Sequence, residues 1–353
     1  MSNIPACPPY IVTRISYSCN YSCPGCYHGH KKELKRFFDS RQLFMRLPEF
    51  KSIVDEVAQY RIKIGLNSLG EIFLNPDAYD MIRYASQAGV RIEFDTNGSL
   101  IDPQALAEAG AADVIFSVDG FSQGTYESYR VGGNLAKVLG KIDTFAHYVR
   151  SIGAHTNIYV KYCINAYTEG ELDSARKYFE SLPGVTFMAD CFFPPPEKFM
   201  HRIEHPNEEP LDIYEKWRPK TMVGFDLYEP DTVRNVAVNK ASTMPFSMAC
   251  GDIYRSMYIE TDGSAYPCCY AFAPRPEDIS KVQEELNYGN VFKDGILNTF
   301  HGENATRLRE AFTKQQGHIP VCATCRANRV NRPIEAVKGD ASKQFMTIDE
   351  FPG

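Results

Sequence analysis

Short strand-like segments alternate with helix-like segments through the first half of the sequence, between residues 10 and 193. The strand-like segments are rich in Val, Ile, Tyr and Phe, and the segments between them repeat apolar residues at helical spacing. Strands connected through helices run parallel, because each crossover returns the chain to the same end of the sheet. We expect strands at 11–18, 61–68, 90–96, 113–118, 156–164 and 184–193, and helices near 41–60, 77–88, 102–109, 133–150 and 169–181.

Six strand–helix units are fewer than the eight that close a complete parallel barrel. The sequence therefore predicts an α/β fold, a partial (β/α)6 TIM-like barrel, and the active site of such a fold lies where the strands end. A cysteine-rich turn follows the first expected strand, Gly70 and Glu71 follow the second, residues 96–98 the third and residues 117–120 the fourth. We expect these four turns to meet at one rim.

The cysteine-rich turn carries Cys19, Cys23 and Cys26 in a C-x3-C-x2-C pattern. The chain has eleven cysteines, an odd number, and no secretory signal pattern at its first residues, so disulfide bonds are not favoured. Clustered cysteines in such a chain more often bind metal or do chemistry. Three thiolates suffice for a [4Fe–4S] cluster with one open iron, whereas a structural cluster takes four. The alternative is a zinc site completed by His28 or His30.

A C-x3-C-x2-C pattern directly after the first strand of a six-unit core resembles the radical S-adenosylmethionine (radical SAM) superfamily, over roughly residues 10–193. The resemblance implies that Cys19, Cys23 and Cys26 ligate a [4Fe–4S] cluster whose open iron chelates S-adenosylmethionine. In that superfamily an electron from the cluster cleaves the sulfonium compound, and the 5′-deoxyadenosyl radical abstracts a hydrogen atom. The cofactor supplies the radical chemistry, and the protein binds and orients the cluster, the cofactor and the substrate.

The resemblance also assigns contacts to S-adenosylmethionine. Gly70 and Glu71, in NSLGE, resemble the Gly-Gly-Glu motif that holds the methionine amino group, with Leu69 in place of one glycine. A carboxylate at that position can pair with the ammonium. Ser117 and Asp119 resemble the ribose-binding positions.

Two further positions belong to the same expected rim. Asn97 lies there with Gly98 beside it. Many members of the superfamily carry an aromatic residue immediately before the third cysteine, where this chain has Gly25. Tyr27, one residue beyond that cysteine, is expected to cover the adenine in its place.

A second group of cysteines surrounds an expected hairpin. Residues 253–260 and 265–270 alternate apolar residues around a turn at 261–264, and its Asp-Gly pair is a strong hairpin signal. A helix is expected at 303–313, before a C-x2-C pair. The four cysteines that this arrangement offers to one site are Cys250, Cys268, Cys322 and Cys325.

This second group resembles the twitch domain, a shortened form of the SPASM extension of some radical SAM enzymes. The resemblance implies one auxiliary [4Fe–4S] cluster that is fully ligated by Cys250, Cys268, Cys322 and Cys325. The expected cofactors are therefore two [4Fe–4S] clusters, one in each cysteine group, and S-adenosylmethionine. Cys269 could replace Cys268, and a four-cysteine zinc site is the alternative.

The expected domains are a radical SAM core at 1–193, a bridging segment at 194–249 that covers the active site, an auxiliary cluster domain at 250–330 and a tail at 331–353. Net charge is −6 without a long basic run, which disfavours nucleic acid as a partner. No apolar run reaches the roughly 18 residues of a membrane span. We expect a cytoplasmic enzyme that takes electrons from a donor such as flavodoxin or ferredoxin.

The expected reaction is radical oxidation or rearrangement of a small polar natural-product intermediate, of sugar or aminocyclitol type, with the auxiliary cluster in electron transfer. The alternative substrate is a ribosomally made peptide, which would be crosslinked, epimerised or altered at a side chain. A non-enzymatic electron carrier is disfavoured by the three-cysteine site. Cys191, at the end of the sixth expected strand, is a candidate hydrogen-atom donor, although a buried apolar role is the more common one for cysteine.

Overall fold

In the computed structural model the residues described are 4–24, 26–30, 39, 41–66, 69–191, 216–217, 219–220, 252–272 and 279–313. Cys250, Cys322 and Cys325 lie outside them, as do most of the expected bridging segment and the whole expected tail. The expected domain boundaries at 193, 249 and 330 also fall outside the described residues.

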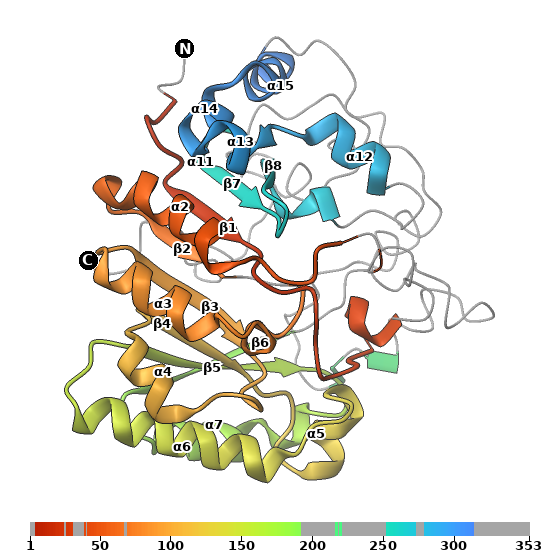
Figure 1. Ribbon diagram of the computed structural model, residues 1–353. Helices are drawn as coiled ribbons and strands as arrows, with labels where there is room; N and C mark the ends of the chain where they lie inside the picture. Colours follow the sequence, from red (N-terminus) through yellow and green to blue (C-terminus); the bar gives the residue numbers. More distant parts are fainter. Residues whose placement is uncertain are drawn as a thin grey trace, which may run out of the picture.

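One sheet of nine strands organises the described residues, in the order β6-β5-β4-β3-β2-β1-β7-β8-β9 (Figure 1). The first six strands follow the sequence order and are all parallel to their neighbours. They are β1 (Tyr10–Thr13), β2 (Lys63–Gly65), β3 (Arg91–Thr96), β4 (Asp113–Ser117), β5 (Asn157–Ile164) and β6 (Val185–Cys191). The predicted partial (β/α)6 barrel is therefore confirmed, although β1 and β2 are shorter than expected.

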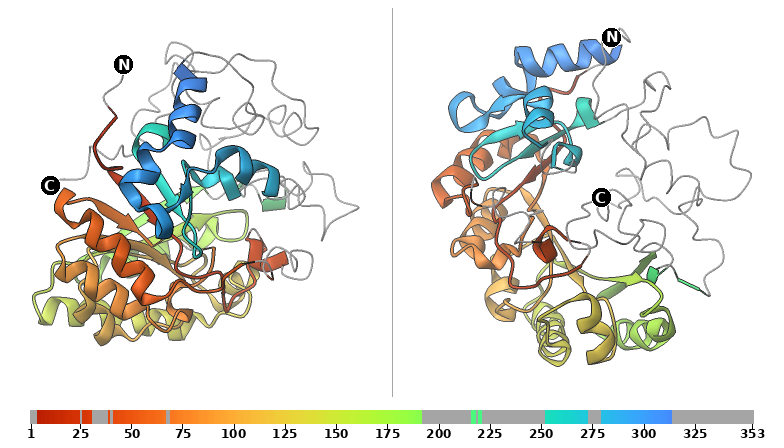
Figure 2. Two further views of the ribbon diagram at one scale, coloured as in Figure 1. Left: turned by 45° about the horizontal axis from the view of Figure 1, so that its top comes forward. Right: turned by 90° about the vertical axis from the view of Figure 1, so that its right-hand side faces the viewer.

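Helices connect these strands and cover one side of the sheet (Figure 2). Each presents an apolar stripe; in α6 the buried residues include Ile142 and Phe145, and the Phe145 ring packs edge-on against Phe116 of β4. Such a stripe buries apolar surface against the sheet, which is the main force that holds the layers together. The helices are α2 (Leu47–Val57), α3 (Ala78–Gln87), α4 (Pro103–Ala109), α5 (Gln123–Tyr129), α6 (Leu135–Ser151) and α7 (Leu172–Glu180).

The expected hairpin is present and continues the core sheet. Strand β7 (Ser256–Ile259) pairs antiparallel with β8 (Ser264–Tyr266), and the turn between them contains Gly263 at φ +84°. Residues expected as the start of the first strand instead form a helical turn, α11 (Asp252–Arg255). Strand β7 also pairs parallel with β1, which the sequence did not indicate.

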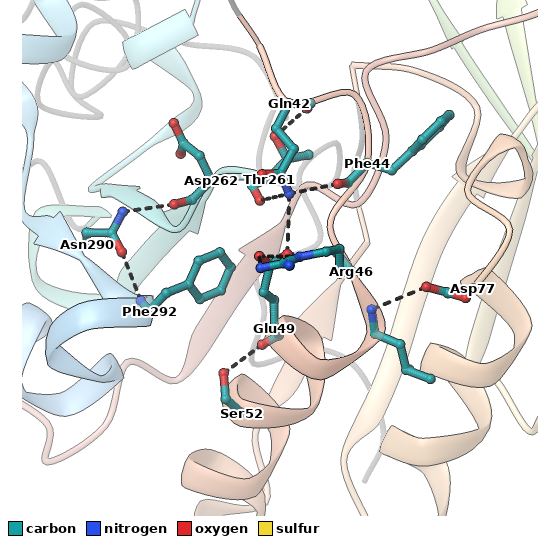
Figure 3. Close-up of polar contacts among 11 residues, drawn as sticks. Gln42, Phe44, Arg46, Glu49, Ser52, Asp77, Thr261, Asp262, Asn290 and Phe292 are labelled. Atoms are coloured by element: carbon teal, nitrogen blue, oxygen red, sulfur yellow. Dashed lines mark hydrogen bonds and ion pairs between the residues drawn. The ribbon is translucent and has the colours of Figure 1, made fainter.

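Short elements complete the C-terminal part. They are β9 (Gly289–Asn290), α12 (Ile279–Leu286), α13 (Val291–Asp294), α14 (Ile296–His301) and α15 (Glu303–Thr313), of which α15 matches the expected helix. Side-chain bonds join this part to the core next to α2 (Figure 3). There the Gln42 amide donates to the Thr261 carbonyl at 2.9 Å, and the Thr261 hydroxyl donates to the Gln42 carbonyl at 2.7 Å.

Asn75 links the segment that follows β1 to the segment that precedes α2. Its buried amide nitrogen donates to the carbonyls of Ile15 at 2.8 Å and Met45 at 2.9 Å. Replacing Asn75 with alanine leaves both buried carbonyls without this donor, so we expect the free energy of unfolding to fall by about 2–4 kcal/mol. Urea unfolding measured anaerobically tests this. Asn298→Ala is the control, because the exposed Asn298 amide of α14 donates to the Asp294 carbonyl at the end of α13, and its expected loss is below about 0.5 kcal/mol.

Candidate active site

The cysteine loop, residues 18–26, follows the end of β1. Cys23 is buried, and Cys19 and Cys26 are half-buried. The Cys26 amide donates to the Cys23 carbonyl at 3.0 Å, and the Gly29 amide donates to the Cys26 carbonyl at 3.0 Å. A β-carbon on Gly29 would lie 2.4 Å from the Cys23 carbonyl oxygen, so only glycine fits this turn. The short helical turn η1 (Tyr27–His30) follows directly.

Three neighbouring loops hydrogen-bond to the cysteine loop. The Glu71 amide, after β2, donates to the Ser18 carbonyl at 2.7 Å. The Asn97 side-chain amide, after β3, donates to the Asn20 side chain at 3.0 Å. The Ser22 amide of the cysteine loop donates to the Val131 carbonyl, after α5, at 3.1 Å. Two of the loops that the sequence placed at one rim, after β2 and after β3, are thus joined to the cysteine loop by direct bonds, and the segment after α5 is a third contact that was not expected.

Gly70 is where the loop after β2 approaches the cysteine loop most closely. A β-carbon on Gly70 would lie 2.3 Å from the Ser18 carbonyl oxygen and 2.8 Å from the Ser18 nitrogen. Both are backbone atoms, so neither can rotate away as a side chain would. This close approach gives a physical reason for glycine in the NSLGE sequence.

Glu71 joins the ends of β2 and β3. Its carboxylate accepts hydrogen bonds from the Thr96 hydroxyl at 2.7 Å and from the Asn97 amide at 2.8 Å. The side chain is buried, which raises the pKa of its carboxyl, while these donors act in the opposite direction. Gly70, Glu71 and Asn97 are therefore assembled next to the cysteine loop, and Glu71 has a structural role there that sequence reasoning did not foresee.

Ser117 and Asp119 differ in their surroundings. Ser117 is half-buried at the end of β4, in register with Lys161 of β5. Asp119 is fully buried, and one carboxylate oxygen accepts from the Arg130 guanidinium at 2.5 Å while the other accepts from the Cys163 amide at 2.9 Å. Sequence reasoning missed Arg130, because a lone arginine after a short helix carries no motif.

Tyr27 is buried directly behind the cysteine loop. Burial raises the pKa of its phenol, the nearby Arg14 lowers it, and the thiols of Cys26 and Cys269 raise it further. An imidazole nitrogen of His28 contacts the Leu69 carbonyl, which links η1 to the loop after β2.

The second cysteine group is described only in part. Cys268 is half-buried and Cys269 is exposed, where the turn η5 (Cys269–Phe272) follows β8. Their three expected partners lie outside the described residues, so the choice between Cys268 and Cys269 stays open. Cys191 is the last residue of β6 and pairs in register with Ile164 of β5.

Two charged side chains lie on the side of the sheet away from the helices. Phe94 and Val160 are buried, so the adjacent Asp95 of β3 and Lys161 of β5 point to the opposite face. Crowding by surrounding protein atoms raises the pKa of the Asp95 carboxyl and Lys161 lowers it, although Asp95 remains exposed. Within the described part of the chain neither side chain makes a hydrogen bond or ion pair.

A buried ion pair lies where β1 meets the hairpin. The Arg14 guanidinium is 2.5 Å from the Glu260 carboxylate, which also accepts a bond from the Tyr17 hydroxyl. Burial raises the pKa of Glu260 to about 7 from its usual 4.5, and Arg14 opposes the shift. The folded protein then binds this proton more tightly than the unfolded chain, so the contribution of Glu260 to stability is largest below pH 4.5 and is lost as pH rises through about 7.

We expect the free energy of unfolding to be lower at pH 8 than at pH 6 by about 1 kcal/mol through Glu260 alone. Glu260→Gln removes this group and should flatten the difference between the two pH values. Anaerobic urea unfolding at both pH values measures it, with Asp80→Asn on the exposed face of α3 as a control that keeps the slope. An equal slope in wild type and Glu260→Gln would contradict the assignment.

The donor set at the cysteine loop fits an iron–sulfur cluster. Three sulfurs lie on one short loop whose backbone is held by its neighbours, and a [4Fe–4S] cluster is ligated by thiolates at separate iron corners. Within the described residues, no three His, Cys, Asp or Glu side chains are grouped as the ligands of a metal ion would be. Burial raises the pKa of Cys19 to about 11, so this thiol is protonated at neutral pH until a metal replaces the proton.

A partial parallel barrel with three cysteines on the loop after its first strand defines a class of iron–sulfur-dependent barrel enzyme. Residues 13–181 match the radical SAM superfamily model, and residues 250–326 match the model of SPASM, an iron–sulfur cluster-binding domain. The chain contains a radical SAM domain followed by a SPASM domain. Its core thus brings a [4Fe–4S] cluster and S-adenosylmethionine, and its SPASM domain brings further iron–sulfur, as expected.

Curated relatives agree with this domain assignment at low identity. An AdoMet-dependent heme synthase of Methanosarcina barkeri is 29% identical over 140 residues, which is 38% of this chain and 38% of that protein. The chain therefore matches less than half the length of that relative. The tungsten-containing aldehyde ferredoxin oxidoreductase cofactor-modifying protein of Pyrococcus furiosus is 23% identical over 329 residues, 90% of this chain and 86% of that protein.

A solved structure shares the fold. The crystal structure of Streptococcus suis SuiB bound to its precursor peptide SuiA superimposes with a TM-score of 0.57 at 12% identity, over 87% of this chain and 68% of that one. No helix within the described residues is long and apolar enough to cross a membrane.

Proposed function

We propose that this enzyme reductively cleaves S-adenosylmethionine and uses the resulting radical to abstract a hydrogen atom from its substrate. The observation that carries the proposal is the set of hydrogen bonds from three neighbouring loops to the cysteine loop. These bonds fix the three thiols beside Gly70, Glu71 and Asn97. Bound cluster and sulfonium cofactor together supply a 5′-deoxyadenosyl radical when one electron arrives.

The chain's own residues hold and orient these groups. Cys19, Cys23 and Cys26 would ligate three irons. Glu71 presents a buried carboxylate that two donors hold in place, which suits it to receive the methionine ammonium.

Ser117 at the end of β4 would contact the ribose, and Tyr27 would cover the adenine. Because both carboxylate oxygens of Asp119 already accept bonds from Arg130 and Cys163, we assign Asp119 to positioning Arg130 rather than to the ribose.

The SPASM domain would hold one auxiliary [4Fe–4S] cluster on Cys250, Cys268 or Cys269, Cys322 and Cys325. A cluster with all four irons ligated by protein suits electron transfer, since burial and hydrogen bonds to sulfur tune its potential. It would accept the second electron in a net oxidation of the substrate. Cys191 at the end of β6 is the hydrogen-atom donor in the redox-neutral alternative.

A small polar substrate is favoured by the face of the sheet that carries Asp95 and Lys161. Their opposite charges, which have no hydrogen-bond or ion-pair partner among the described residues, suit a ligand with hydroxyl, amino or carboxylate groups, which would gain charge-assisted hydrogen bonds. The two curated relatives are named for heme synthesis and for modification of a cofactor, which also accords with a small molecule. We propose an intermediate of sugar or aminocyclitol type.

A ribosomally made peptide is the second candidate. It is supported by SuiB, which shares the fold and was crystallised with its precursor peptide. An external donor such as flavodoxin or ferredoxin would reduce the core cluster in either case. A cytoplasmic location belongs to the same proposal, because free thiols and reducible clusters need a reducing compartment.

Deuterium tracing tests the reaction and separates the two substrate classes. Reduced enzyme is incubated with S-adenosylmethionine and either perdeuterated aminocyclitols and sugars or a deuterated peptide encoded near the gene. We expect deuterium in 5′-deoxyadenosine with the small molecule, and less with Asp95→Asn or Lys161→Met. Transfer from the peptide alone would overturn the small-molecule proposal. No 5′-deoxyadenosine under any reducing condition would overturn the reaction itself.

A further inference from the structure

Arg130 makes a direct contact with a sulfur of the cysteine loop. Its Nη1 lies 3.8 Å from the Cys23 Sγ, within the range of a hydrogen bond to sulfur. The guanidinium is only 16% exposed, and Cys23 is buried. A charge that is largely removed from water acts more strongly on its neighbours than a solvated one.

Asp119 fixes the direction in which this guanidinium points. Nε and Nη2 of Arg130 both contact one carboxylate oxygen of Asp119 at 2.5 Å, which leaves Nη1 on the side of Cys23. The other oxygen of Asp119 accepts from the Cys163 amide of β5, so the carboxylate is itself anchored to the sheet. The Arg130 guanidinium also lies 5.5 Å from the Tyr129 ring centroid.

The backbone around Arg130 is bonded to the same cysteine loop. The Val131 carbonyl accepts from the Ser22 amide at 3.1 Å, and the Tyr21 and Tyr126 hydroxyls are 3.4 Å apart. The arginine therefore approaches Cys23 from a segment that is attached to the loop at two further points. Its position is part of the fold and does not depend on one flexible side chain.

We propose that Arg130 is a positioning residue that donates a hydrogen bond to the Cys23 sulfur ligand and raises the reduction potential of the core cluster. Reduction adds one electron to the cluster and its thiolates, and a cation donating to a ligand sulfur stabilises the more negative state. Loss of this donor therefore makes the cluster harder to reduce. The inference rests on the proposed function, because it takes Cys23 to be a cluster ligand.

The test is an anaerobic redox titration of the core cluster, followed by electron paramagnetic resonance, in the enzyme without S-adenosylmethionine. We expect Arg130→Gln to shift the midpoint potential to a more negative value. The midpoint of Arg130→Lys should lie between those of Arg130→Gln and the wild type, because lysine keeps the charge but cannot donate to Asp119 and Cys23 in the fixed geometry of a guanidinium. Arg176→Gln, which removes an exposed cation on α7, is the control and should leave the potential unchanged.

A kinetic measurement distinguishes an effect of Arg130 on the reduction potential from a merely structural role. With a weak reductant, formation of 5′-deoxyadenosine by Arg130→Gln should fall at least about tenfold, and a stronger reductant should restore most of it. A structural defect would not respond to the reductant. If Arg130→Gln assembles no cluster, the midpoint potential of the core cluster in Arg130→Lys tests the proposal instead.

An unchanged midpoint in either cluster-bearing variant overturns the inference. If instead Cys23→Ala keeps the core cluster, the ligand assignment fails and with it the proposed function. A Cys23→Ala protein that loses the core cluster, combined with an unshifted Arg130→Lys, leaves the proposed function standing and removes only the role of Arg130.

Discussion

Gly70→Ala is expected to lower the rate of S-adenosylmethionine cleavage by at least about 100-fold. The added β-carbon would lie 2.3 Å from the Ser18 carbonyl oxygen, so the loop after β2 and the cysteine loop must move apart. That movement breaks the bond between the Glu71 amide and the Ser18 carbonyl and displaces the carboxylate of Glu71. The measurement is 5′-deoxyadenosine formed per enzyme under saturating reductant.

Gly140→Ala is the matched control, because it makes the same chemical change where there is room. Gly140 lies inside α6, and a β-carbon placed there would meet no described atom within 4 Å beyond its chain neighbours and the backbone of its own helix. Alanine is favoured over glycine in a helix, so this variant should keep full activity and gain up to about 1 kcal/mol of stability. Equal activity in the two variants would show that the close approach of Gly70 is not required.

Cys23→Ala is expected to abolish S-adenosylmethionine cleavage and to remove the core cluster while the auxiliary cluster remains. Wild-type protein reconstituted without oxygen should hold about eight irons, two clusters of four, and the variant about four. Iron analysis combined with electron paramagnetic resonance measures both quantities. A variant that still holds about eight irons would remove Cys23 from the ligand set.

Cys7→Ala is the control for the loss of a thiol elsewhere. Cys7 is buried, its sulfur lies 3.7 Å from the Pro8 carbonyl, and burial raises the pKa of the thiol to about 12. It is therefore protonated at neutral pH and serves as a small apolar residue. We expect full iron content and activity, with a stability loss of about 1 kcal/mol.

Local patterns in the sequence predicted the parts of the fold that local chemistry determines. The six strands and their helices, apart from α5, follow from the spacing of apolar residues, and the turn at Asp262-Gly263 follows from the positive φ that glycine adopts there. The meeting of the strand ends follows from the parallel topology. These features needed no knowledge of contacts between distant residues.

The features that were missed depend on such distant contacts. The pairing of β1 with β7 joins residues about 250 positions apart, and no periodicity marks it. Arg130 becomes significant only because α5 places it beside Cys23, and Asn75 only because two carbonyls converge on it. The helical turn at Asp252–Arg255 replaced the start of an expected strand, because the alternating pattern there is too short to distinguish a strand from a helix.

The parallel pairing of β1 with β7 has a consequence for how such enzymes can be recombined. The barrel and the C-terminal part are joined by backbone pairing between β1 and β7. The register of this pairing is fixed, with Tyr10 opposite Ser256 and Thr13 opposite Ile259. A chimera that takes the C-terminal part from another enzyme must supply a strand that fits this register. Without one, β1 becomes an unprotected sheet edge that invites aggregation.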